Sequence, residues 1–175
     1  NRGRDKIVEG WPLILAAGLP EWYAGPIETD RHWPALKQVF VDGGWDQERI
    51  DSVDASSSKV VAHTPEPHTA HFASRGLVVG YVQSGKTTNF TAVAAKLADV
   101  KYKFIIVLSG IHNGLRRQTQ ERLEQQLTQG NKSTEWSKLT DLDRDFHTPS
   151  QSHMSLFGSP NQVVLAVVKL SLIHI

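Results

Sequence analysis

The sequence predicts an α/β fold, in which a parallel sheet with flanking helices follows a small helical region. Two apolar runs without polar alternation, at residues 76–82 and 103–108, are typical of parallel strands covered on both faces. Between them, apolar side chains recur at helical spacing after Gly85, so strand, helix and strand form a βαβ unit. A third apolar run at 163–168 predicts another core strand. Together these patterns indicate a partial parallel α/β core at residues 76–169.

The region before this sheet is rich in tryptophan and is expected to be helical from residue 1 to 67. Trp33, Leu36 and Phe40 recur at helical spacing until Gly43-Gly44 ends the pattern. A second short helix is expected to begin after Asp46 as its cap, with apolar side chains facing inward at Ile50 and Val53. Four of the five tryptophans lie here, and we interpret them as a small core in preference to a platform for stacked bases.

A polar connector at residues 68–75 is expected to link the two regions. Nearby histidines at 63, 68 and 71 suggest a metal site, but Pro65 and Pro67 exclude the regular helical spacing that would bring two rings to one ion. We therefore expect a linker and no metal site there. The polar segment at 130–160 is expected to be an insertion with a strand or short helix near 137–146.

Composition limits the classes of partner. The 175 residues carry a formal charge of +1, so a nucleic-acid contact would need a local basic patch. There is no cysteine, which excludes disulfides and thiolate metal sites and favours a cytoplasmic location. No apolar run is long enough to span a bilayer, so no membrane contact is expected. The chain starts without methionine, and we interpret it as a fragment, with a non-native tail at 170–175 as one hypothesis.

The most informative stretch is residues 80–87, which fit G-x-x-x-x-G-K-[ST], the phosphate-binding loop (P-loop, or Walker A motif). Glycines at 80 and 85 allow a tight turn whose N–H groups face a phosphate, and the positive end of the next helix adds to the attraction. Lys86 is expected to reach the β- and γ-phosphates of ATP, and the Thr87 hydroxyl to bind Mg²⁺. The predicted nucleotide-binding residues are Gly80, Gln83, Ser84, Gly85, Lys86, Thr87 and Thr88. With this motif, residues 76–169 are expected to be a partial P-loop NTPase core with a parallel sheet.

A helix expected from Asn113 to Gln129 has an unusually narrow apolar stripe. Leu115, Leu123 and Leu127 form the stripe with Thr119, and arginines and glutamines occupy most other positions. One interpretation is a solvated helix with ion pairs such as Arg117 with Glu121. The other is that the arginines and glutamines at its start face the phosphates of a nucleic acid.

Residues 76–87 and 102–120 resemble the Z-one domain family, an endonuclease-associated family of bacterial proteins with a helicase-like P-loop ATPase core in restriction-type DNA processing and phage defence. The resemblance covers residues 50–169. It implies that the block after the second strand contacts the DNA backbone, and so favours the second interpretation of the arginine-rich helix. The implied DNA-contact residues are Asn113, Arg116, Arg117 and Gln118.

The family also implies a downstream Walker B acid and a second ATPase lobe, which this chain lacks. Asp141 and Asp143 follow no apolar strand and are a poor substitute, so the catalytic residues are unknown and the chain is expected to bind ATP but hydrolyse little. No clustered carboxylates support a nuclease site. The first hypothesis is therefore the ATP-binding part of a DNA-dependent ATPase. The alternative is a nucleotide-dependent regulatory switch or interaction module, and a small-molecule kinase is a third possibility that the arginine-rich helix disfavours.

Overall fold

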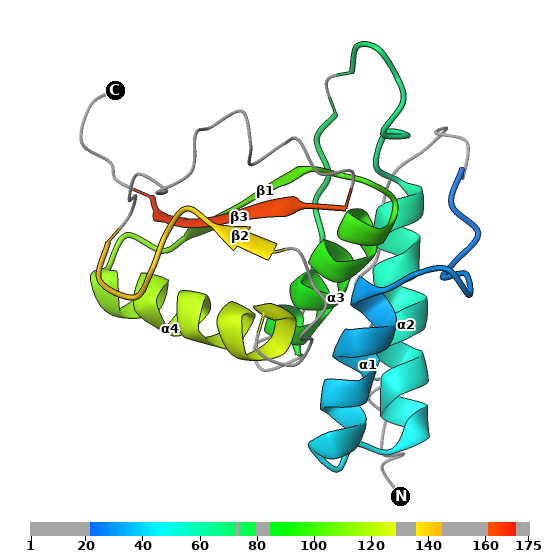
Figure 1. Ribbon diagram of the computed structural model, residues 1–175, viewed down its shortest axis with the longest axis horizontal. Coiled ribbons are helices and arrows are strands. Elements are labelled where there is room, and N and C mark those ends of the chain that lie inside the picture. Colours follow the sequence, from blue (N-terminus) through cyan, green and yellow to red (C-terminus); the bar gives the residue numbers. More distant parts are fainter. Residues whose placement is uncertain (1–21, 73, 80–84, 129–135, 145–160, 171–175) are drawn as a thin grey trace, which may run out of the picture.

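The computed structural model describes residues 22–72, 74–79, 85–128, 136–144 and 161–170. Within these residues it contains a small parallel sheet and four α-helices (Figure 1). The fold is therefore mixed α/β, as predicted. Several predicted features lie outside the described residues, namely the start of the chain with Trp11, loop residues 80–84, most of the 130–160 insertion and the end of the tail.

Two helices form the N-terminal part. Helix α1 spans His32–Asp42 and buries Trp33, Leu36 and Phe40, and Gly43 follows it as the C-cap, as the sequence predicted. Helix α2 spans Gln47–Ala62, longer than expected. Its predicted cap is confirmed, because the Asp46 side chain accepts a hydrogen bond from the backbone N–H of Arg49 at 2.8 Å. The tryptophans that the structure describes lie in or against hydrophobic cores, which confirms that interpretation for them.

Helix α3 spans Lys86–Asp99 and packs against both α1 and α2. The carboxylate of Asp99, in its last turn, accepts the backbone N–H groups of Arg31, His32 and Trp33, each at 2.8 Å. Asp99 thus satisfies free N–H groups at the start of α1, where α1 has no side-chain cap of its own. The predicted helix after Gly85 is confirmed. Its apolar stripe is buried only in part, because Phe90, Val93 and Leu97 are half-buried. Residues beside the stripe are fully buried instead, since α1 and α2 both pack against the helix.

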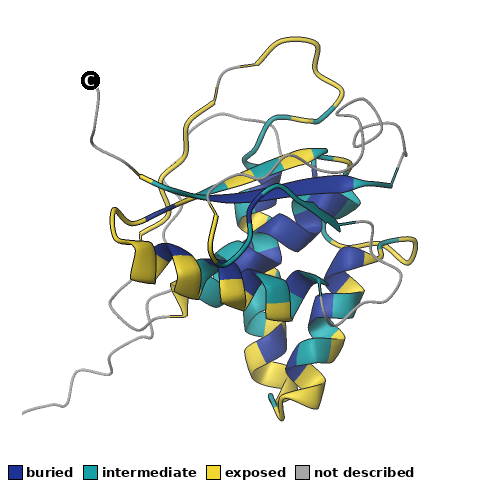
Figure 2. Ribbon diagram, turned by 60° about the vertical axis from the view of Figure 1, so that its left-hand side comes forward, coloured by how far each residue is buried: buried dark blue, intermediate teal, exposed yellow. Residues whose placement is uncertain are grey.

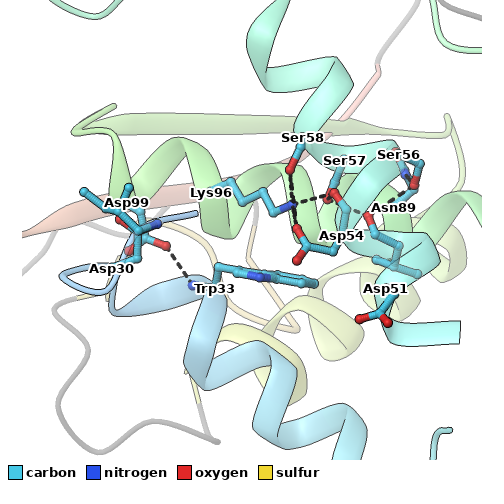
Figure 3. A network of polar contacts seen from close by, with 12 residues as sticks. Asp30, Trp33, Asp51, Asp54, Ser56, Ser57, Ser58, Asn89, Lys96 and Asp99 are labelled. Atoms are coloured by element: carbon cyan, nitrogen blue, oxygen red, sulfur yellow. Dashed lines mark hydrogen bonds and ion pairs between the residues drawn. The ribbon is translucent and has the colours of Figure 1, made fainter. Parts of the chain in front are cut away.

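A buried polar network joins these helices (Figure 3). Lys96 of α3 is fully buried, and its ammonium group donates to the backbone carbonyl of Asp54 and the hydroxyl of Ser58, both at 2.7 Å, and to the Asp54 carboxylate. The same ammonium lies 4.4 Å from the centre of the Trp33 ring. Lys96 therefore contacts α1 and α2 at once, and every N–H of its ammonium group has a partner.

The sheet has three parallel strands in the order β1-β3-β2. Strand β1 spans Phe104–Ser109, β2 spans Trp136–Lys138 and β3 spans Val163–Lys169. Phe104 pairs with Val164 at one end of the β1–β3 register and Ser109 with Lys169 at the other. Residues 163–167 of β3 are all buried, so β3 is the central strand that is covered on both faces. The predicted third core strand is confirmed.

The other two strand predictions need correction. In the described part of the run at 76–82, residues 76–79 form no strand beyond a single bridge at Val79, and Leu77 is 77% exposed. An apolar run forms a strand only if another strand lies beside it to pair with. In the described sheet the central position, with a neighbour on each side, is occupied by β3. The run at 103–108 does form a strand, but it is buried on one face only, because Phe104, Ile106 and Leu108 are exposed.

Helix α4 spans Asn113–Leu123 and continues as a π-helical turn, η1, over Glu124–Thr128. Its buried face differs from the prediction. Leu123 and Leu127 are buried, but Leu115 is 50% exposed, and the buried positions in the first turns are Arg116 and Gln120. The inward stripe is therefore shifted by one residue at the start of the helix. Polar side chains can occupy it because each of them finds an acceptor or donor in the 140–142 segment.

One hydrophobic core connects the helical region to the sheet. Its buried members come from α1, α2, α3, α4, η1 and β3. In Figure 2 the buried segments, drawn in dark blue, lie on the helices and along the central strand of the sheet. The two regions that the sequence separates thus share a core in the structure. Strand β2 is a short strand at the start of the predicted 137–146 element, and residues 139–144 that follow it form no helix or strand. Among the described residues, no helix is both long and apolar enough to cross a membrane.

Candidate phosphate-binding site and basic pocket

The predicted phosphate-binding residues divide into a described and an undescribed part. Gly80, Gln83 and Ser84 lie outside the described residues, whereas Gly85 to Thr88 form the start of α3. Gly85 is the N-cap residue and has a left-handed backbone, with φ at 74°. That conformation favours glycine, and nothing lies within 4 Å of the position of a Cβ atom there. The second glycine of the motif therefore has a conformational reason to be glycine.

The first turn of α3 presents polar groups to solvent. The Lys86 side chain is exposed, and Thr87 and Thr88 are half-buried. Because Gly85 has no side chain, it cannot cap the N–H groups of this turn, and the positive end of the helix dipole lies at the same place. Asn89 fixes the turn on α2, since its amide donates to the Ser56 hydroxyl at 2.7 Å. This arrangement fits a phosphate group.

The fit to Mg²⁺ rests on one ligand. The Thr87 hydroxyl stands at the start of the helix, where the motif places its Mg²⁺ ligand, and Mg²⁺ usually takes its remaining ligands from phosphates and water. Among the described residues, no group of three histidine or carboxylate side chains could hold a metal ion. Asp141 and Asp143 lie in the loop after β2, where the Asp141 carboxylate accepts the N–H groups of Asp143 and Arg144 at 2.8 Å.

One contact at this site was not foreseen. Arg122, in the last turn of α4, donates from Nη1 to the Thr87 hydroxyl at 3.4 Å. In the sequence Arg122 is one of several arginines and glutamines outside the apolar stripe of its helix. No local signal could have placed it here, because the contact depends on how the end of α4 packs beside the start of α3.

Three of the four DNA-contact candidates, Asn113, Arg116 and Arg117, lie elsewhere, around a pocket at the carboxyl edge of the sheet, and Gln118 does not line it. The pocket has a volume of about 390 Å³ and is lined from α4 by Asn113, Gly114, Arg116 and Arg117. Leu142 and Asp143 line it from the loop after β2, and Lys169 from the end of β3. Ligands of open α/β sheets bind at this edge, beyond the carboxyl ends of the strands. Three cationic residues and one carboxylate make the lining basic.

The four DNA-contact candidates differ in solvent exposure. Asn113, Arg117 and Gln118 are exposed, whereas Arg116 is only 3% exposed. The Arg116 guanidinium donates to the backbone carbonyls of Asp141 and Leu142 at 2.7 and 2.6 Å. Arg116 therefore holds the wall of the pocket. Arg117 pairs with Asp143 at 3.2 Å, and not with Glu121 as the solvated-helix interpretation expected.

Helix α4 reaches both candidate sites. Asn113 begins α4 at the basic pocket, and Arg122 meets the start of α3 nine residues later, which is about 14 Å along the helix axis. No protein family, curated protein or solved structure matches this chain. Its function must therefore be argued from these two sites.

Proposed function

We propose that the chain is the ATP-binding part of a helicase-like P-loop ATPase that processes DNA, as its resemblance to the endonuclease-associated Z-one domain family implies. The observation that carries the proposal is the start of α3. There the G-K-[ST] residues of the motif coincide with a left-handed glycine, the first turn of a helix and an exposed lysine. Lys86 would contact the phosphates of ATP, and Thr87 would bind Mg²⁺.

The basic pocket supports the DNA part of the proposal. Asn113, Arg117 and Lys169 would bind phosphate oxygens of the DNA backbone, since an amide and two cations at a helix N-terminus match that chemistry. Arg116 would keep the pocket wall in place. The nuclease activity that the family name suggests has no support among the described residues, where no metal-binding cluster occurs.

Calorimetry with Mg-ATP tests the nucleotide site. We expect the parent to bind and Lys86→Ala to lose at least tenfold in affinity, equivalent to about 1.4 kcal/mol, once circular dichroism shows that both are folded. A folded parent that does not bind Mg-ATP would remove the ATPase proposal for this chain.

Fluorescence anisotropy with labelled single- and double-stranded DNA tests the pocket. Arg117→Ala and Lys169→Ala should each weaken binding and lower its salt dependence, because each removes a phosphate contact. Lys59→Ala is the matched control, since Lys59 is an exposed cation on α2 that does not line the pocket. Equal effects of all three changes would mean that DNA binding follows total charge and not the pocket.

A nucleotide-dependent regulatory switch is the second candidate. The observation that favours it is the shared core. It links α3, which has the phosphate-binding residues at its start, to Trp33 of α1. DNA should stimulate ATP turnover by a longer protein containing this chain if it is a DNA-dependent ATPase. ATP binding that alters tryptophan fluorescence, with no effect of DNA on turnover, would favour the switch.

A further inference from the structure

Three arginines of α4 have different surroundings. Arg116 donates to two backbone carbonyls and Arg117 pairs with the carboxylate of Asp143. Arg122 is exposed and contacts a neutral hydroxyl, that of Thr87, at 3.4 Å. Within the part of the chain that the structure describes, no carboxylate lies within ion-pair distance of Arg122. Arg122 is thus a cation with a long hydrogen bond and no anionic partner there.

Its position is electrostatically unfavourable unless an anion is present. The guanidinium stands beside the N-terminus of α3, which carries a partial positive charge, and beside the residue that follows Lys86. Cations are normally favoured at the opposite end of a helix. An anion between Arg122 and the first turn of α3 would convert this repulsion into attraction from both sides.

We propose that Arg122 is a phosphate-binding residue of the site that begins at Lys86, and that it binds the terminal phosphate of a nucleoside triphosphate. This inference rests on the proposed nucleotide site. If the Thr87 hydroxyl bound Mg²⁺, its long hydrogen bond from the guanidinium would be lost, and Arg122 would be free to donate to a phosphate held beside the first turn of α3. The planar guanidinium can donate two parallel hydrogen bonds to a phosphate, which lysine cannot.

The assignment has a structural consequence. Arg122 lies in the last turn of α4, and the first residues of the same helix line the basic pocket. A phosphate bound by Arg122 would therefore contact the helix that begins at Asn113. Nucleotide binding at the start of α3 would then act directly on the helix that lines the basic pocket, with no loop between them.

Calorimetric titrations of ATP and ADP, each with Mg²⁺, test this role with the whole chain. Arg122→Ala should weaken ATP binding at least fivefold and ADP binding less than twofold, and Arg122→Lys should recover only part of the loss. The charge-matched control is Arg144→Ala, because Arg144 is exposed, lies in the loop after β2 and does not line the pocket. It should leave both affinities within twofold of the parent.

The outcomes separate the two proposals. If Lys86→Ala abolishes ATP binding while Arg122→Ala and Arg122→Lys both bind ATP as the parent does, the site exists and the role of Arg122 is excluded. Equal losses for ATP and ADP would also exclude a contact with the terminal phosphate. If the folded parent binds neither nucleotide, the proposed function fails, and the role of Arg122 fails with it.

Discussion

The ammonium group of Lys96 on α3 lies 2.5 Å from the carboxylate of Asp54 on α2, at a point where the Lys96 side chain is fully buried. Burial lowers the pKa of Lys96 because it removes the charged form from water, and the hydrogen bond and charge of Asp54 oppose that effect. The Asp54 side chain is 28% exposed, so water reaches one partner only. Asp54 and the two neutral acceptors on α2 thus favour the charged form of Lys96, which burial disfavours.

Removing the carboxylate should destabilise the protein strongly. Asp54→Ala leaves a buried cation with two neutral acceptors, and we expect the free energy of unfolding in urea to fall by roughly 3 kcal/mol. Asp54→Asn keeps an acceptor oxygen and should cost less. The double change Asp54→Ala with Lys96→Met should recover part of the loss, because it removes the unpaired charge. If Asp54→Ala unfolds at the same urea concentration as the parent, the ion pair contributes nothing to stability.

The burial of Asp30 predicts that the stability of the protein depends on pH. Burial raises the pKa of Asp30 above the ordinary 3.8 and Asp99 adds to this, although the N–H of Ile27 donates to the Asp30 carboxylate at 2.9 Å and opposes the shift. The folded protein therefore holds this proton more tightly than the unfolded chain, so ionised Asp30 lowers stability at neutral pH. That penalty disappears as the pH falls through the raised pKa toward 3.8.

Asp30→Asn keeps an acceptor for Ile27 and removes the charge. We expect it to be more stable than the parent at neutral pH, and the advantage to shrink as the pH falls until it vanishes below the ordinary carboxyl pKa. Urea unfolding of both proteins at matched pH values measures the difference. An advantage that is constant with pH would show that the effect is not due to ionisation.

Arg116 and Arg117 are neighbours with different expected roles in stability. Arg116 is buried and donates two short hydrogen bonds to carbonyls of the loop after β2, so Arg116→Ala should lower the free energy of unfolding by roughly 2–4 kcal/mol. Arg117 pairs with Asp143 where both side chains are largely exposed, so Arg117→Ala should cost less than about 0.5 kcal/mol. Thermal or urea unfolding compares them directly. Similar losses would contradict the conclusion that Arg116 holds the loop after β2 in place.

The features that the sequence predicts well have a local cause. α1 could be predicted because Trp33, Leu36 and Phe40 recur at helical spacing before two glycines, and the start of α2 because Asp46 can cap its own helix. β3 could be predicted because its apolar run is buried on both faces. In each case the residues that specify the element lie within it or beside it.

The features that the sequence missed depend on packing between distant elements. Lys96 interrupts the apolar pattern of α3, and this was the only local sign of a buried cation, but its partner is 42 residues away. Arg116 resembles a surface residue until the loop with Asp141 covers it. The run at 77–79 is apolar enough for a strand, yet strand formation needs a neighbour, which sequence pattern does not provide.

The outer side chains of β1 predict how the isolated chain behaves at high concentration. Phe104, Ile106 and Leu108 are 43%, 50% and 64% exposed at alternate positions of a strand at the end of the described sheet order. Exposed apolar side chains on such a strand promote association, and a lysine there opposes it. We expect Ile106→Lys to shift light-scattering profiles toward the monomer with little change in stability, since Ile106 is already half exposed.

Ile105→Lys makes the same chemical change on the side that packs against the core, so it should lower stability by more than about 2 kcal/mol. Unchanged association in Ile106→Lys would mean that this face does not drive self-association.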